Sequence, residues 1–211
     1  MSLKNAYLET AAQAAALLDA PEVAALWGKP SALAEWTVGG LAGHLMYQIF
    51  SVTPALQEPE SESDPISLLD HYSRAMWIDA PLDGDVNSGI RAKGEGISSE
   101  GVQPLRERAY AVLDEQRVGL AQLRGDHVVF MPQTGWALTL DDFLVTRMVE
   151  LAVHMDDLAV SVGGHAAELP HAAFAPVVAL LTELSARRHG QAALLRALTR
   201  MERAPAAINV F

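Results

Sequence analysis

An acidic residue and a histidine four positions apart, Glu150 and His154, are the residues of this sequence that most directly suggest chemistry. The surrounding segment, from Asp142 to Leu158, has apolar residues at helical spacing, and residues four apart on a helix lie on the same face. One carboxylate and one imidazole pointing at the same spot are two of the three protein ligands of an open His₂Glu zinc site. A solitary histidine in a second apolar segment, His44, is the best candidate for the third ligand. A fourth position would remain for water or substrate.

The same segment carries a narrow polar stripe formed by Arg147, Glu150, His154 and Asp157. The rest of its surface is apolar, which fits a helix buried on most sides beside a polar cleft. An ordinary solvent-facing stripe explains the spacing as well, and the sequence leaves this alternative open. Arg147 either holds an anionic substrate or, as the spacing slightly favours, pairs with Glu150. Asp157 either orients His154 from behind or faces water.

Other polar residues give weaker indications. Arg74 and Arg91 are further candidates for binding an anion. Tyr47 or His71 could fill the open position of the metal, which would favour a binding or sensing role over catalysis. The histidines outside the two segments fit surface, cleft-edge, loop or helix-end positions better than a metal site; they are His71, His127, His165, His171 and His189.

Charge and composition exclude several classes of function. The 211 residues include 15 Lys+Arg and 26 Asp+Glu, for a net charge of -11. This balance argues against a nucleic-acid partner and against anionic membrane surfaces, because both require a basic face. No apolar run approaches the ~20 residues that span a bilayer. Since residues 1–5 lead directly into an Ala-rich helix, we expect no secretory leader and a cytoplasmic protein.

The sequence contains no cysteine. Disulfides, thiolate zinc sites and a cysteine nucleophile are therefore impossible. Any metal must be bound by histidine and carboxylate side chains, and any thiol chemistry needs a thiol supplied from outside.

The apolar periodicity predicts a mainly α protein, a helical bundle with a small β-hairpin and extra C-terminal helices. We expect residues 1–164 to form the bundle and residues 165–211 to form a helical extension packed on it, not a separate full domain. Thr37 and Asp141 are the expected N-caps of the two segments that carry the candidate ligands. The expected helices cover residues 3–20, 21–28, 38–50, 66–78, 102–123, 142–162, 171–189 and 191–203. The expected hairpin strands are 127–131 and 136–140, the segment 79–101 reads as a loop, and 207–211 reads as an edge strand.

Two motifs resemble those of a known family. The segment Trp-Thr-Val-Gly-Gly-Leu-Ala-Gly-His-Leu at 36–45 resembles the pattern Trp-Ser/Thr-Val-x-Asp-Leu-x-x-His. The segment at 147–159 resembles the pattern Arg-x-x-Glu-x-x-x-His-x-x-Asp. Together they resemble the mycothiol-dependent maleylpyruvate isomerase N-terminal family of the DinB-like superfamily. The resemblance covers roughly Leu3 to Gly164 and departs from the pattern at Gly40, where an Asp is usual.

This resemblance implies a DinB-like four-helix bundle that holds a divalent metal on His44, Glu150 and His154. The metal is usually zinc, with nickel possible, and mycothiol is the implied cosubstrate. We expect a metal-dependent transferase or isomerase in which a thiolate attacks a small electrophile, with Arg147 and Asp157 assisting. Alternatives are a metal-dependent hydrolase, in which the same site activates water, a non-catalytic metal- or ligand-binding module, and a bundle with a vestigial site. Bundles of this superfamily are often dimers, so a homodimer is also possible.

Overall fold

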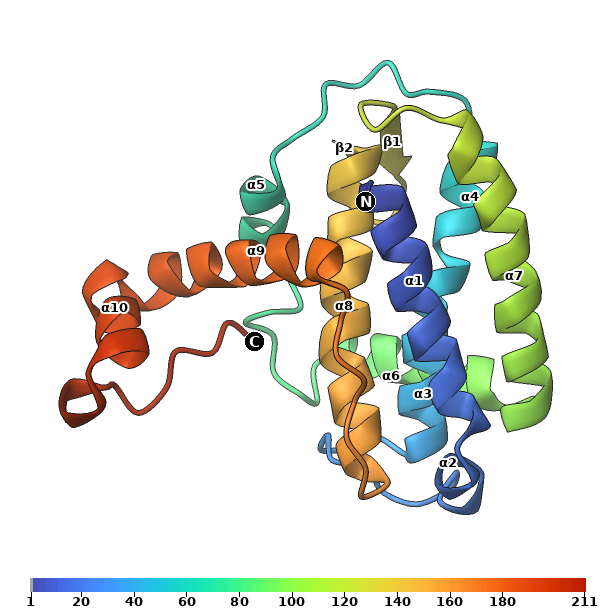
Figure 1. The fold of residues 1–211 in the computed structure, drawn as a ribbon, viewed down its shortest axis with the longest axis horizontal. Helices are drawn as coiled ribbons and strands as arrows, with labels where there is room; N and C mark the ends of the chain where they lie inside the picture. Colours follow the sequence, from blue (N-terminus) through green and yellow to red (C-terminus); the bar gives the residue numbers. More distant parts are fainter. Residues whose placement is uncertain (1) are drawn as a thin grey trace.

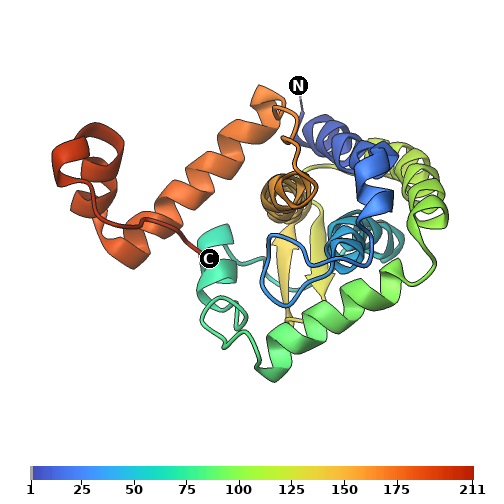
Figure 2. The same cartoon turned by 90° about the horizontal axis from the view of Figure 1, so that it is seen from below.

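The computed structural model describes residues 2–211. Four long helices run alongside one another (Figure 1): α1 (Leu3–Ala16), α3 (Val38–Phe50), α7 (Val102–Gln122) and α8 (Leu140–Ser161). They contact one another in the cyclic order α1, α7, α3, α8, and Figure 2 shows this ring of helices nearly end-on. The predicted mainly α four-helix bundle is confirmed.

The bundle core is formed by the apolar faces that the periodicity predicted. Burying each large apolar side chain contributes roughly 1.5–3 kcal/mol before entropy is counted. One polar connection crosses this core: Tyr7 of α1 donates to Oε1 of Gln116 of α7 at 2.8 Å, and Gln116 donates to the carbonyl of Ile49 of α3 at 2.7 Å. These bonds fix three helices relative to one another. Fully buried side chains include Leu41, Leu45, Met46, Ile49, Leu105, Leu120, Leu144, Met148 and Leu151.

Threonine side chains begin the two helices that carry the candidate ligands. Thr37 accepts a hydrogen bond from the backbone N–H of Gly40 at 2.8 Å, which confirms the predicted cap of α3. The prediction that Asp141 caps α8 is wrong, because Thr139 is the cap and accepts from the N–H of Asp142 at 3.1 Å. Asp141 instead lies in the first turn, where its negative charge favours the helix N-terminus.

The predicted hairpin is present. Strands β1 (Val128–Met131) and β2 (Trp136–Thr139) pair antiparallel, and Gly135 in the turn has a φ of 83°, which favours glycine. Because β2 leads directly into α8, the hairpin lies at the N-terminal end of that helix.

The segment 79–101, predicted as a loop, contains a further helix, α6 (Asp85–Ser98). It crosses α3 (Figure 2), and the approach is close: a Cβ at Gly94 would lie 2.5 Å from the carbonyl oxygen of Gly40 and 3.3 Å from Cβ of His44. The helix predicted at 66–78 is shorter, α5 (Leu68–Ser73), and is followed by turns. Short helices α2 (Pro21–Ala25) and α4 (Val52–Gln57) complete this part of the chain, and the first helix ends in a 3₁₀ turn, η1 (Leu17–Asp19).

The C-terminal segment forms α9 (His171–His189), α10 (Gln191–Thr199) and a 3₁₀ turn, η2 (Met201–Arg203). One part of α9 contacts α1 and α8, and the helix then leads away from the bundle to α10 (Figures 1 and 2). The predicted edge strand at 207–211 is wrong, since β1 and β2 are the only strands within residues 2–211. Instead, side chains of α9 bind the tail carbonyls, as where Ser185 donates to that of Ile208 at 2.8 Å. No helix in this described range is long and apolar enough to cross a membrane.

Candidate metal centre

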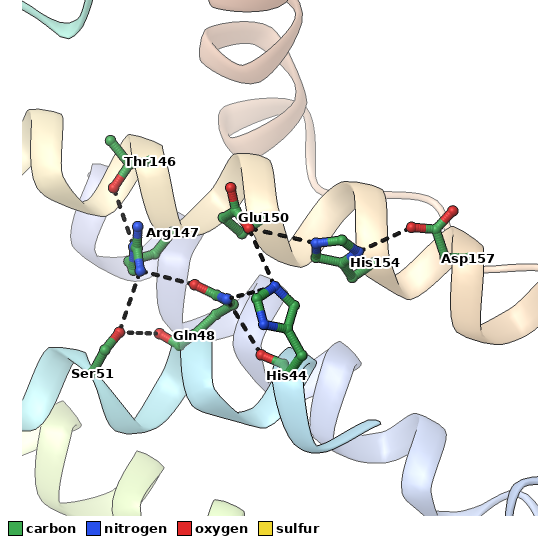
Figure 3. Close-up of polar contacts among 8 residues, drawn as sticks. All are labelled: His44, Gln48, Ser51, Thr146, Arg147, Glu150, His154 and Asp157. Atoms are coloured by element: carbon green, nitrogen blue, oxygen red, sulfur yellow. Dashed lines mark hydrogen bonds and ion pairs between the residues drawn. The ribbon is translucent and has the colours of Figure 1, made fainter. Parts of the chain in front are cut away.

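The polar stripe of α8 faces α3 rather than bulk solvent. Side chains of His44, Glu150 and His154 expose only 12%, 16% and 17% of their surface. Figure 3 shows His44 rising from α3 toward the two α8 residues, which lie one helical turn apart. The interpretation of the stripe as an ordinary solvent face is therefore wrong.

The three candidate ligands converge on one point. Oε2 of Glu150 lies 3.6 Å from Nε2 of His44 and 3.5 Å from Nε2 of His154. One ligand atom from each of the three residues lies within 4.8 Å of the other two, and no other such group occurs among residues 2–211. Two ligands bound ~2.0–2.1 Å from a tetrahedral ion lie about 3.3 Å apart, so the donor types and separations fit an open zinc-type site.

Asp157 lies directly behind His154. Its Oδ2 is 3.0 Å from Nδ1 of His154, one turn further along α8. A bond at Nδ1 leaves Nε2 as the nitrogen that faces Glu150, which is the arrangement found when a carboxylate orients a metal-binding histidine.

The charges of the group follow from its burial and its neighbours. Burial alone would raise the pKa of the Glu150 carboxyl, but His154, His44 and the positive charge of Arg147 hold that pKa well below its usual range. Burial alone would lower the pKa of His154, but hydrogen bonds to Asp157 and Glu150 raise it to about 9. Burial lowers the pKa of His44. At neutral pH, His44 is thus neutral and His154 is an imidazolium that must lose a proton before it binds a metal.

Arg147 does not pair with Glu150, contrary to the pairing that the spacing favoured. Within residues 2–211 it forms no ion pair; it donates to Oε1 of Gln48 at 2.8 Å, to Oγ of Ser51 at 3.4 Å and to Oγ1 of Thr146 at 3.1 Å (Figure 3). All three acceptors are neutral. No contacting carboxylate therefore balances the guanidinium charge, and an arginine in this state can bind an anionic group.

Gln48 is the residue at this site that the sequence analysis missed. It lies one turn after His44 on α3, is 2% exposed, and its Nε2 is 3.2 Å from Nε2 of His44. Its position four residues after a candidate ligand was the signal that could have found it.

A cleft of about 760 Å³ lies on the Arg147 side of the centre. Arg147 forms part of its lining and also donates to Gln48, the neighbour of His44. The candidate ligands themselves do not line the cleft, so Arg147 and Gln48 connect the two. The other lining residues come from α3, α4, the loop of residues 58–63, α5 and the turns after it, the hairpin and α8. They include Tyr47, Ser51, Pro54, His71, Trp77, Phe130 and Phe143.

The weaker candidates lie elsewhere or have other partners. Arg74 stacks on the ring of Trp136, and Arg91 donates to the carbonyl of Leu82; neither lines the cleft. Tyr47 and His71 line the cleft without joining the ligand group, and Nδ1 of His71 accepts from the indole N–H of Trp136 at 3.1 Å.

The fold and the site together define a helical bundle with a largely buried His₂Glu cluster between α3 and α8. Residues 7–159 match the family described as mycothiol maleylpyruvate isomerase N-terminal domain, and the chain belongs to that family, as the motifs predicted. A search of curated proteins finds no match. Among solved structures, the crystal structure of the mycothiol-dependent maleylpyruvate isomerase superposes with a TM-score of 0.53 at 19% identity, covering 88% of this chain and 70% of that one. A mutant of that enzyme gives a TM-score of 0.53 at 18% identity, with the same coverage. At this identity the likeness establishes a shared fold.

Proposed function

We propose that this chain is a divalent-metal-dependent enzyme that uses mycothiol to transform a small electrophile, as a transferase or an isomerase. The observation that carries the proposal is the convergence of two imidazoles and one carboxylate, one helical turn from Arg147, which lines a cleft. Family membership supports mycothiol as the thiol, and the mycothiol-dependent isomerase among the similar structures supports this reaction type.

His44, Glu150 and His154 would hold the metal, zinc or nickel, with Asp157 orienting His154. A divalent ion held there would lower the pKa of a bound thiol from about 8.5, so that thiolate is present at neutral pH. The absence of cysteine from the chain is consistent with an imported nucleophile.

Arg147 would bind an acidic group of the electrophile. Its guanidinium is part-buried, lines the cleft and has only neutral hydrogen-bond partners. A local cation of this kind is needed because the net charge of -11 repels anions from the protein as a whole. The thiol would lose its proton, and the thiolate would add to an electrophilic carbon of a conjugated C=C bond, whose π electrons move onto the adjoining carbonyl. A transferase would protonate and release this adduct, whereas an isomerase would re-form the C=C bond after rotation and expel the thiolate.

The test is thiol dependence of turnover by the zinc-loaded protein. Maleylpyruvate and a panel of small electrophilic acids are incubated with mycothiol, with glutathione or with no thiol. We expect turnover that requires mycothiol, is lost in His44→Ala and is retained in His165→Ala, a loop histidine outside the ligand group. Turnover without any thiol would instead identify a hydrolase, and no turnover with any substrate would favour a binding module.

A further inference from the structure

Gln48 joins the candidate metal ligands to the candidate anion site, and only one orientation of its amide satisfies both neighbours. Its Oε1 accepts from Nη1 of Arg147 at 2.8 Å, and its Nε2 lies 3.2 Å from Nε2 of His44 (Figure 3). An arginine side chain only donates hydrogen bonds, so the amide oxygen must face Arg147 and the amide NH₂ must face His44.

The consequence falls on the ring of His44. A metal binds Nε2 only when that nitrogen is unprotonated, and in the same state its lone pair accepts the amide N–H of Gln48 at 3.2 Å. The amide NH₂ also donates to the backbone carbonyl of His44 at 3.3 Å, which keeps it beside the ring. The same Nε2 faces Glu150 at 3.6 Å and is the atom expected to bind the metal. One lone pair cannot serve both partners at once.

We propose that Gln48 couples metal binding at His44 to anion binding at Arg147. The inference rests on the proposed function, since it takes His44 as a ligand and Arg147 as the anion site. Without an anion, Arg147 anchors the Gln48 carbonyl and the amide N–H competes with the metal for Nε2. An anion that accepts from Nη1 of Arg147 loosens this anchor and frees His44, so metal and anion strengthen each other's binding. Gln48 is thus a positioning residue that acts through His44.

The test is zinc affinity, measured at fixed pH by competition with a chromophoric chelator. Gln48→Met keeps the side-chain length and removes the N–H, so we expect zinc to bind roughly two- to tenfold more tightly, the range of one lost competing hydrogen bond. Gln116→Met is the matched control, because Gln116 is equally buried, at 1% exposure, but contacts none of the ligands. It should lower stability and leave zinc affinity unchanged.

To test the anion dependence, zinc affinity is measured again with sulfate in place of chloride at constant ionic strength. Sulfate should tighten zinc binding in the wild type and have no effect in Gln48→Met. A wild type that binds zinc equally well with and without sulfate would overturn the coupling.

The sign of the effect separates this role from a structural one. If Gln48 merely supports His44, folded Gln48→Met binds zinc as weakly as the wild type or more weakly, which overturns the proposal. If that variant does not fold, Gln48→Leu decides in the same way, because it also lacks the N–H and adds no charge or ligand beside the metal. A wild type that binds no zinc would refute the metal centre itself, which distinguishes failure of the proposed function from failure of the coupling.

Discussion

The bond between His154 and Asp157 should determine much of the affinity for the metal. The two side chains are 17% and 22% exposed and their bonded atoms are 3.0 Å apart, so water screens this contact little. Losing a carboxylate partner of a metal-binding histidine typically costs 10–100-fold in affinity. We therefore expect zinc to bind about tenfold more weakly in Asp157→Asn, which retains an acceptor, and about 100-fold more weakly in Asp157→Ala.

Proton competition sets the pH at which this should be measured. Asp157 and Glu150 raise the pKa of His154 to about 9 despite burial, so in the wild type a proton competes with zinc throughout the neutral range. Removing Asp157 lowers that pKa and relieves the competition, which masks part of the loss at pH 7. The difference in zinc affinity between the wild type and the Asp157 variants should therefore be largest near pH 9 and smaller at pH 7.

The assay is chelator competition at pH 7 and pH 9 on folded protein. Asp156→Asn is the matched control, because Asp156 is the exposed neighbour on the same helix and loses the same charge. If Asp157→Asn and Asp156→Asn bind zinc equally well at pH 9, Asp157 does not orient His154 and the reasoning is refuted.

Three further predictions follow from packing, burial and linkage. Burial, with the charge of Arg147, lowers the pKa of His71 from 6.5 to about 4, so the stability due to neutral His71 is complete above pH 6.5 and is lost as the pH falls toward 4. When the pH falls from 7 to 5, the free energy of unfolding of the metal-free protein, measured with urea, should fall by about 2 kcal/mol more in the wild type than in His71→Gln. An equal fall in both proteins would contradict this. Gly94→Ala should lower the free energy of unfolding by about 1–3 kcal/mol, because the added methyl group forces α6 away from α3. Gly96→Ala in the same helix has open space around it and should raise the free energy of unfolding by up to about 1 kcal/mol. An unchanged free energy of unfolding in Gly94→Ala would contradict the tight contact. Zinc at 100 times its Kd should raise the unfolding free energy by about 2.7 kcal/mol in the wild type and not in His44→Ala, and a chelator should reverse the gain.

The bundle helices were predictable because local signals and tertiary packing agree. In α3 and α8 an apolar period of 3.6 coincides with a threonine before the first turn, and a glycine with positive φ, Gly163, follows α8. The cap of α8 was still misplaced by two residues, because Thr139 also ends a strand and Asp141 has an equally suitable side chain.

Helix α6 was missed because its composition points to a loop. Gly89, Gly94 and Gly96 lie inside it, and glycine is among the poorest helix formers. For Gly94 the reason is tertiary: its missing side chain lets α6 approach the backbone of Gly40 on α3. Gly40 and Gly94 are 54 positions apart in the sequence (94 − 40), so their contact leaves no periodic pattern in either helix.

The candidate ligands were predictable from spacing and motif, but their surroundings were not. A helix of period 3.6 places Glu150 and His154 on one face whatever else the protein does. Whether Arg147 pairs with Glu150 or turns to Gln48 depends on where α3 lies relative to α8. That is decided by core packing between distant segments, so the sequence pattern alone favoured the wrong partner.

Metal content tests the central claim most directly. Elemental analysis of tag-free wild-type protein and of His154→Ala, each supplied with zinc and then freed of unbound ion, would show whether His44, Glu150 and His154 form a metal site. We expect about one equivalent in the wild type and none in the variant, with both proteins folded. No bound metal in the wild type, even after zinc or nickel is added, would contradict this claim.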